Sequence, residues 1–589
     1  MKFNKSFLSM LAIAAVVVAC EKPAPTPDDP TQDPTETPSE PEEPEEPEVT
    51  EDGTEAHPYL LKTTDDLAAM REKALPGTET WFRLENDIDM TGVTNWTPIN
   101  CGDVTGEGEA AVTKFERKIN FDGNGKTISN FAPATYMIDK LTEASYPSFF
   151  GVLYGTCKNL TITNASIADA KTASGILAGF VGTQDGEVKM PGVVTNVSVQ
   201  GTITAGIDKI GGMAGSAYNA TFENCNVDVV ITTTSTDVGG LVGKAVGDLV
   251  CSGCNVKANI TSSAATKNRV GGFIGWNSTV TTTITNCHVL EGSVLTDASN
   301  RASASNGNYG GLIGFGDTTG TVLTISKSSA TTVIEGGLGT YNAGFIGGLG
   351  YASTAVITDS WAKGSVVGNN YTGGFCGAVQ NNTTIERCWA DVEVTSSNQR
   401  VGAFIGTNTE PIVIKNCYSL GNASGVGQQV GGLIGYDKVG ATIECCFTAG
   451  DITATKSGAA GFVGTMDGQT SSVVKCIAWN KNIVCSRTAA TAWAPGAFVG
   501  AVTKDGGKYA DCYRRADMVL TDAAGAMTLF DQENVEGALP AAPDYSTETT
   551  QRAYHGKAAA AGATISSVAK QLGWDETIWD LSKDVPTLK

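Results

Sequence analysis

A short block of glycine and apolar residues recurs along most of the chain. Residues 431–435, Gly-Gly-Leu-Ile-Gly, are a representative copy, and a stretch rich in Thr, Val and Ile follows them. The third residue of the block recurs about every 30 residues, a spacing typical of stacked repeats. It falls at Phe150, Phe180, Met213, Leu241, Phe273, Leu312, Phe345, Phe375, Phe404, Leu433, Phe462 and Phe498. The pattern predicts a stack of repeats rather than one globular core.

Each repeat is predicted to consist of short strands separated by turns, because β-branched residues dominate between the glycines. Residues 150–515 contain no amphipathic helical window of useful length. About three strands per repeat suit one coil of a parallel β-helix, whose coils stack roughly 4.8 Å apart. A β-propeller blade needs four strands, and these repeats are too short for that. We therefore expect an all-β fold, a right-handed parallel β-helix of about 12 coils with a small helical cap at each end.

Residues 385–394 indicate which side chains point inward. From Cys388 to Val394 the even positions are small or apolar, whereas Trp389, Asp391 and Glu393 occupy the odd positions. Successive side chains of a strand point to opposite faces, and burying unpaired charges is costly. The Cys388 face is therefore predicted to be interior, and the step of three from Ile385 to Cys388 predicts a bend.

Large side chains follow the Cys/Ser position in successive repeats and are predicted to form an outward column. The column contains Trp361, Trp389, Tyr418, Phe447, Ile477 and Tyr513. Four of its aromatic residues are candidate ligand-binding residues, with Asp391 and Glu393 placed beside them to bond hydroxyl groups: Trp361, Trp389, Tyr418 and Phe447. Such a strip could stack against sugar rings or a partner protein. Alternatively, it is a cross-strand ladder that only stabilises the sheet.

The cysteines occupy one repeat position and are predicted to be buried thiols rather than disulfides. Ser328 and Ser360 fill the same position in two repeats, so the position requires a small residue rather than a disulfide partner. The cysteines of this column are Cys225, Cys254, Cys287, Cys388, Cys417, Cys446, Cys476 and Cys512. No metal or other cofactor is expected, because Cys251 and Cys254 form an isolated CxxC pair.

The two ends of the chain differ from the repeats. Residues 1–20 resemble a lipoprotein signal peptide that ends at Cys20, the predicted lipidation site. Residues 21–56 are a proline-rich tether, in which residues 21–55 carry fourteen acidic residues against Lys22 and thus −13 of the formal −22 charge. Residues 57–149 are predicted to be an N-terminal cap with the first coils, 150–515 the repeat β-helix, and 516–589 a C-terminal cap over the last coil.

Composition and spacing exclude several functional classes. Most of the negative charge lies in the tether, and glycine blocks occur in nearly every repeat, so neither nucleic-acid nor nucleotide binding is expected. The three histidines are too far apart in the chain to form one site. Asp391, Glu393 and Asp451 could supply the carboxylates of a polysaccharide lyase or glycosidase, but no pair is marked as having tuned acidity. An enzyme therefore remains an alternative, as does a purely structural spacer.

The glycine blocks and the Asn-Cys-Tyr strand at 416–418 resemble the GLUG-motif repeats of bacterial surface proteins. The opening Pro58-Tyr59-Leu60-Leu61 and the ending Gly573-Trp574 to Lys589 resemble the segments that flank such repeats. This resemblance implies an adhesin-like β-helix of the Bacteroidetes type on the cell surface. With Cys20, it predicts a protein anchored by lipid in the outer membrane and facing the exterior. Its expected partners are that membrane and an extracellular glycan, host glycoprotein or surface protein.

Overall fold

The computed structural model describes residues 51–99, 103–105, 112–114, 117–132, 135–136, 147–170, 173–185, 187–206, 209–266, 268–299, 307–317, 322–336, 339–350, 354–486, 495–503, 507–529 and 554–589. Residues 51–589 form one compact unit. The predicted signal peptide, Cys20 and most of the predicted tether lie outside the described residues, so these predictions are not tested.

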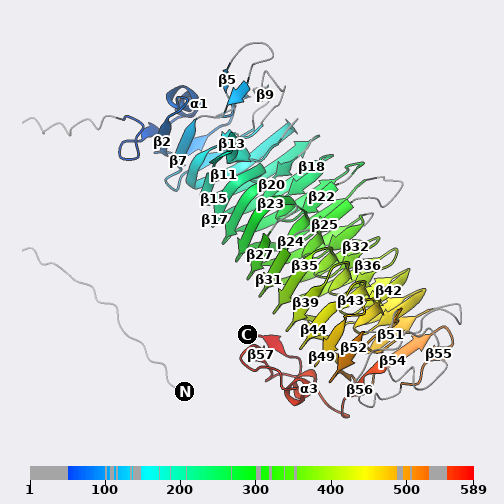
Figure 1. Cartoon of the computed structure of the whole chain (residues 1–589). Helices are drawn as coiled ribbons and strands as arrows, with labels where there is room; N and C mark the ends of the chain where they lie inside the picture. Colours follow the sequence, from blue (N-terminus) through cyan, green and yellow to red (C-terminus); the bar gives the residue numbers. More distant parts are fainter. Residues whose placement is uncertain are drawn as a thin grey trace, which may run out of the picture. The chain divides into compact units, whose positions relative to one another are not determined.

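Parallel strand pairs stack coil upon coil along this unit (Figure 1). For example, all eight residues of β32 (Trp361–Gly368) pair in parallel with β36 (Trp389–Ser396), 28 residues further on. Most strands belong to a 41-stranded sheet and a nine-stranded sheet. This arrangement confirms the all-β fold and the parallel β-helix.

The glycine block separates two sets of strands. In one coil the chain turns at Gly432-Leu433 between β42 (Gln428–Gly431) and β43 (Ile434–Asp437), and the two strands join different sheets. The first set forms the nine-stranded sheet: β16 (Ile210–Gly211), β19 (Asp237–Gly239), β22 (Asn268–Gly271), β25 (Gly307–Gly310), β29 (Tyr341–Ala343), β33 (Thr372–Gly373), β37 (Val401–Gly402), β42 and β47 (Ser457–Ala460). The second set is β10 (Phe150–Leu153), β12 (Ala178–Val181), β17 (Ala214–Glu223), β20 (Val242–Ser252), β23 (Ile274–Thr285), β26 (Ile313–Gly316), β30 (Ile346–Leu349), β34 (Cys376–Val379), β38 (Ile405–Asn408), β43 and β48 (Val463–Met466).

Two further sets complete each coil. Strands β17, β20 and β23 extend into the third set, which continues as β27 (Val322–Ser326), β31 (Thr354–Thr358), β35 (Asn382–Glu386), β39 (Ile412–Lys415), β44 (Ala441–Glu444), β49 (Ser472–Val474) and β52 (Lys508–Ala510). The fourth set contains β32 and β36 and also β11 (Gly155–Ala170), β15 (Gly192–Ala205), β18 (Asn226–Thr233), β21 (Asn255–Ser262), β24 (His288–Asp297), β28 (Ser329–Glu335), β40 (Tyr418–Ser419), β41 (Ala423–Gly425), β45 (Phe447–Thr448), β46 (Ile452–Ala454), β50 (Ile477–Ala478), β51 (Asn482–Cys485), β53 (Tyr513–Arg514), β54 (Val519–Asp522) and β56 (Lys557–Ala558).

The third residue of the glycine block lines the interior, with two corrections to its predicted positions. From Met213 to Phe498 the predicted residues are buried, and Phe345, Phe375 and Phe404 stack at centroid distances of 4.6 and 4.8 Å. Leu177, rather than Phe180, donates its N–H to the Met213 carbonyl of the next coil. In the first block the interior position is occupied by Phe149 rather than by Phe150. In both blocks the interior residue is the one that stands two residues before a glycine: Gly151 follows Phe149, and Gly179 follows Leu177.

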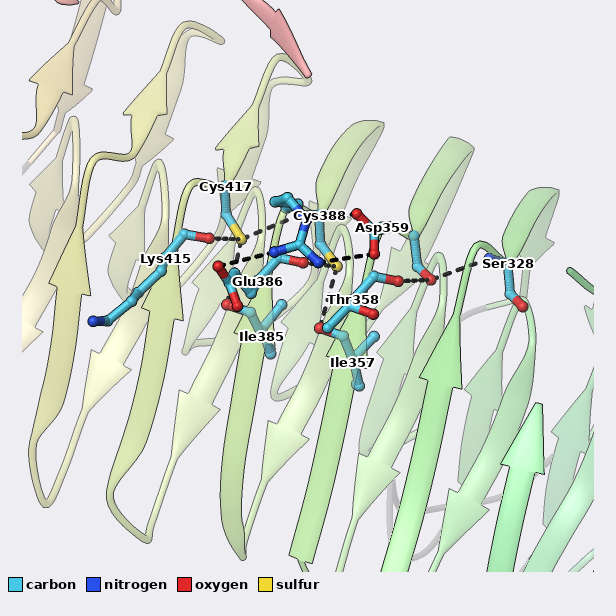
Figure 2. Close-up of polar contacts among 11 residues, drawn as sticks. Ser328, Ile357, Thr358, Asp359, Ile385, Glu386, Cys388, Lys415 and Cys417 are labelled. Atoms are coloured by element: carbon cyan, nitrogen blue, oxygen red, sulfur yellow. Dashed lines mark hydrogen bonds and ion pairs between the residues drawn. The ribbon is translucent and has the colours of Figure 1, made fainter. Parts of the chain in front are cut away.

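The predicted bend before the cysteine column is a residue in the left-handed backbone region. Arg387 has φ 52°, and Asn416, the equivalent residue in the next coil, has φ 53°. The Cys388 thiol closes this corner by donating to the Glu386 carbonyl at 3.3 Å, and the Cys388 N–H donates to Sγ of Cys417 at 3.4 Å (Figure 2). Asn and Asp adopt this conformation more readily than other non-glycine residues.

Serine replaces cysteine in the column because a hydroxyl makes the same two bonds. Ser328 donates to the Ser326 carbonyl at 2.8 Å and accepts the Cys287 N–H at 3.1 Å (Figure 2 shows Ser328). All column cysteines are buried and free in the structure, as predicted. Burial raises the pKa of the Cys417 and Cys476 thiols, which favours the protonated, unreactive form. The column therefore satisfies backbone groups at the corner as well as filling space.

The N-terminal part begins the stack and carries a helical cap. Helix α1 (Thr64–Lys73) starts at a capping box formed by Thr63 and Asp66 and buries Leu67 and Met70. The first parallel strands are β1 (Tyr59–Leu61), β2 (Glu79–Leu84), β3 (Ile88–Asp89), β7 (Lys118–Asp122) and β8 (Thr127–Ser129). Small pairs lie beside the stack: β4 (Asn95–Trp96) with β9 (Thr135–Tyr136), β5 (Asp103–Thr105) with β6 (Val112–Lys114), and β13 (Thr183–Asp185) with β14 (Val188–Met190).

The C-terminal part is not only the predicted cap over the last coil. Strand β56 does add a rung by pairing with β53, and β55 (Gly525–Ala526) pairs back onto β54. Beyond β56, however, helix α3 (Ile565–Gln571) and the hairpin of β57 (Trp579–Asp580) and β58 (Thr587–Leu588) turn back along the side of earlier coils (Figure 1). We call residues 559–589 the C-terminal strap. Its apolar side chains pack against Tyr418, Phe447 and Ile477 of the aromatic column.

Candidate ligand-binding surface

The four candidate aromatic residues form one stack on the outside of the fourth set of strands. Register pairs Trp361 with Trp389, Trp389 with Tyr418, and Tyr418 with Phe447. Their ring centroids lie 5.1, 5.6 and 4.8 Å apart, and the ring planes differ by 12°, 2° and 5°. The structure therefore brings the four rings together as predicted from the repeat. Before Trp361 the column is polar, with Ser329 and His288 in the preceding coils.

The C-terminal strap covers the distal half of this stack. Tyr418 is 5% exposed and Phe447 is fully buried, because Trp579 packs with its centroid 6.0 Å from each ring. The Trp579 indole N–H donates to Oδ1 of Asn416, and that of Trp574 donates to the Lys475 carbonyl. Tyr418 and Phe447 point away from the coil as predicted, but they are not the open platform that the alternation suggested. A strand pattern shows which face a side chain occupies and not what later covers that face.

Trp361 and Trp389 form the open end of the stack. Both are half-buried and lie beyond the fully buried rings. The Lys363 Nζ lies 5.6 Å from the Trp361 centroid and 5.2 Å from that of Trp389, which places a cation beside both indoles. Asp391 is exposed and pairs in register with Lys363. This corner thus offers indole surface, an ammonium donor and a carboxylate acceptor within two coils.

Glu393 belongs to a second outward column, next to the aromatic one. One of its oxygens accepts from the Asn422 side chain at 2.9 Å, and Asn422 Oδ1 in turn accepts the Asp451 N–H at 2.8 Å. Asp451 then accepts two bonds from Asn482 at 2.9 Å. Asn422 separates Glu393 from Asp451, so these two carboxylates do not form the closely spaced pair that a retaining glycosidase needs. The exposed Glu393 can accept bonds from hydroxyl groups.

A second group of rings, on the opposite side of the glycine block, was not predicted from the sequence. Phe315 stacks on Tyr341 at 6.0 Å, Tyr341 lies 5.2 Å from Tyr371, and Arg400 packs against Tyr371 and Tyr436 at 4.9 and 4.8 Å. A signal was present, because Tyr341, Tyr371 and Arg400 each stand four residues before the third residue of a block. The predicted binding residues came only from the column after the cysteines.

Metal sites and membrane-spanning helices do not occur among the described residues. Within those ranges, no group of three or more His, Cys, Asp or Glu side chains is arranged to hold a metal ion. None of the helices in the same ranges combines the length and apolar character needed to cross a membrane. His288 lies in the outward column, where its Nδ1 bonds Ser329 at 2.8 Å, and burial lowers its pKa.

Comparisons with known proteins found few matches. No family model matches the chain. Over 187 residues, 32% of this chain, the sequence is 30% identical to halomucin from Haloquadratum walsbyi, and the match spans only 2% of that protein. A solved structure of a "putative immunoglobulin A1 protease" from Bacteroides ovatus aligns over 91% of this chain and 94% of that chain, with 18% identity and a TM-score of 0.23. Neither relative assigns the chain to a family.

Proposed function

We propose that this protein is a surface-displayed binding protein of the adhesin type, which holds glycans or glycoproteins on the stacked indoles of Trp361 and Trp389. The observation that carries the proposal is that two indoles with nearly parallel planes remain half-open at the end of a stack that is otherwise covered. Trp361 and Tyr418 cover the two faces of the Trp389 indole, so a sugar ring would stack on the outer face of Trp361 and contact the indole edge of Trp389. Lys363 and Asp391 stand beside the indoles as donor and acceptor for hydroxyl groups, and Glu393 offers a further acceptor four residues after Trp389 on β36.

The arrangement supports binding better than the enzyme alternative from the sequence. Asn422 lies between Glu393 and Asp451, so these two carboxylates lack the close spacing of a retaining glycosidase. The same ring stack would also stabilise a pure spacer, so the double tryptophan variant below decides between binding and spacing. The resemblance to GLUG-motif surface proteins is consistent with a role outside the cell.

Replacing both Trp361 and Trp389 with Ser is expected to abolish glycan binding while the protein stays folded. The loss of stability should be only about 1–2 kcal/mol, since the change removes a few half-exposed cross-strand contacts. A glycan array followed by calorimetry on the purified chain measures binding, and thermal unfolding measures stability. A matched control replaces Val356 and Val322 with Ser, two exposed residues on the third set of strands. Glycan binding that survives the double tryptophan change would rule the platform out.

We further propose that the protein is anchored in the outer membrane through a lipid on Cys20 and faces the exterior. The support is the apolar segment that ends at Cys20 and the acidic tether after it. Changing Cys20 to Ala is expected to move the protein from the membrane fraction to the soluble fraction, because the acyl chains supply the membrane affinity. The control Cys445→Ala removes a half-buried thiol of a repeat and should stay with the membrane. Unaltered partitioning of the Cys20 variant would contradict the anchor.

A further inference from the structure

Three residues surround the Arg400 guanidinium group where the nine-stranded sheet meets the second set of strands. Arg400 Nη1 donates to the Tyr371 hydroxyl at 2.6 Å, and its Nε donates to Oε1 of Gln429 at 3.2 Å. The guanidinium carbon lies 4.9 Å from the Tyr371 ring centroid and 4.8 Å from that of Tyr436. We call Tyr371, Arg400, Gln429 and Tyr436 the Arg400 cluster.

The charge of Arg400 has no carboxylate partner in the described part of the chain. A guanidinium has five N–H groups, and the two bonds above use two of them. The nearby carboxylates have other partners: Asp467 accepts the Tyr436 hydroxyl at 3.0 Å, and the buried Asp437 accepts from Asn408 at 2.9 Å. Three N–H groups of Arg400 therefore remain for a ligand. Because Arg400 is half-buried, a ligand would bind them in a partly desolvated place.

Three residues of the Arg400 cluster occupy equivalent positions in successive coils and adopt a backbone conformation that favours glycine. Tyr371, Arg400 and Gln429 have φ of 46°, 64° and 69°, in the left-handed region that bulky residues rarely adopt. Register places Gly458 at the equivalent position of the next coil, also with φ 69°. A glycine therefore fits this corner of the coil without strain. A non-glycine residue keeps this conformation only where its contacts offset the cost, and Arg400 has such contacts with Tyr371, Gln429 and Tyr436.

The geometry points to a carboxylated sugar, such as a uronic or sialic acid residue within a glycan, as the ligand of the Arg400 cluster. The planar fork of the guanidinium matches a carboxylate. The adjacent rings of Tyr341 and Phe315 continue along the coils and offer apolar surface to neighbouring sugars. Gly348 lies beneath them, where an added Cβ would come within 2.8 Å of the Phe315 ring.

An acidic peptide fits this surface less well. Peptides that bind sheets usually add a strand at an open edge. Strands β33, β37 and β42 are interior members of the nine-stranded sheet, each with neighbours on both sides. The backbone groups of these strands are already paired between coils, so a ligand would contact the side-chain rings and the guanidinium instead. This inference does not depend on the tryptophan pair, which lies on a different set of strands.

The test measures calorimetric binding of three carboxylated probes to the purified full chain: tetragalacturonate, a hyaluronan octasaccharide and 3′-sialyllactose. At least one should bind, and its methyl ester should bind about tenfold more weakly or not at all, because esterification removes the charge. Arg400→Gly should cause the same loss and remain folded, since glycine occupies this corner in the Gly458 coil. Arg400→Lys should bind weakly, because it keeps the charge and loses the fork.

Two controls distinguish the Arg400 cluster from general attraction to positive charge and from the tryptophan pair. Lys415→Gln removes one exposed positive charge on the third set of strands and should leave binding unchanged. The Trp361→Ser/Trp389→Ser variant should also bind the acidic probe normally, so failure of the tryptophan proposal and failure of this one are distinguishable. The inference is overturned if none of the three probes binds, if Arg400→Gly binds as tightly as the unaltered chain, or if a polyglutamate peptide binds as tightly as the sugars.

Discussion

Changing Trp579 to Ala is expected to detach the C-terminal strap and to lower the free energy of unfolding by about 3–5 kcal/mol, the usual cost of removing a buried Trp side chain. Trp579 is fully buried and packs against Tyr418, Phe447 and Trp574. Its indole N–H also supplies the bond to Asn416, 163 residues away in the chain. Urea denaturation measures the stability, and hydrogen exchange of residues 559–589 measures detachment of the strap.

The matched control for Trp579 is Ile578→Ala in the same turn. Ile578 is only partly buried against the strap cluster, so its truncation should cost clearly less. In the Trp579 variant, trypsin should cut faster after Lys570 in α3 and after Lys583, because a detached strap can unfold locally around both residues. A strap that keeps its exchange protection without Trp579 would show that Ile565, Val568 and Leu572 hold it alone.

Local patterning was sufficient to predict the faces of individual strands. In β36 the burial alternates as expected, with Asp391 and Glu393 exposed and Val392 and Val394 buried. The step of three from Ile385 to Cys388 is a left-handed corner at Arg387. These features depend on neighbouring residues of one strand, and their energetics can be read from a short window.

The register of the first coils was harder to predict, because Phe149 and Phe150 are both large and apolar. Only the glycine that stands two residues after the interior residue distinguishes them. Gly151 marks Phe149 rather than Phe150, and Gly179 marks Leu177 rather than Phe180. Both residues of the first pair are buried, so hydrophobicity alone does not decide between them.

Contacts between distant segments could not be predicted from the repeat pattern. The apolar residues of the C-terminal part predicted a cap over the last coil, whereas the strap packs along the side of earlier coils. The position of the strap depends on the contact between Trp579 and Tyr418, two residues that lie far apart in the sequence. Three residues of the Arg400 cluster, in contrast, have a periodic sequence signal: Tyr371, Arg400 and Gln429 each stand four residues before the third residue of a block. Their left-handed backbone was visible only in the structure.

Truncating Phe375 to Ala is expected to lower the free energy of unfolding by about 3–5 kcal/mol through the cavity left in the interior. Phe375 is fully buried in the middle of three stacked rings, with Phe345 and Phe404 at 4.6 and 4.8 Å. Each coil contacts only its neighbours, so the damage should be local.

Hydrogen exchange should therefore quicken in β30, β34 and β38 and remain nearly unchanged in β11 and β15, which lie many coils away. The control Val356→Ala truncates a side chain that is 42% exposed and should change stability by less than about 0.5 kcal/mol. Uniform loss of protection along the whole stack would mean that the coils unfold as one cooperative unit, because nearest-neighbour coupling then exceeds the stability of each coil. In that case the same truncation would also release the ring stack of Trp361 and Trp389, and the Phe375 variant would lose glycan binding without any change at the binding surface.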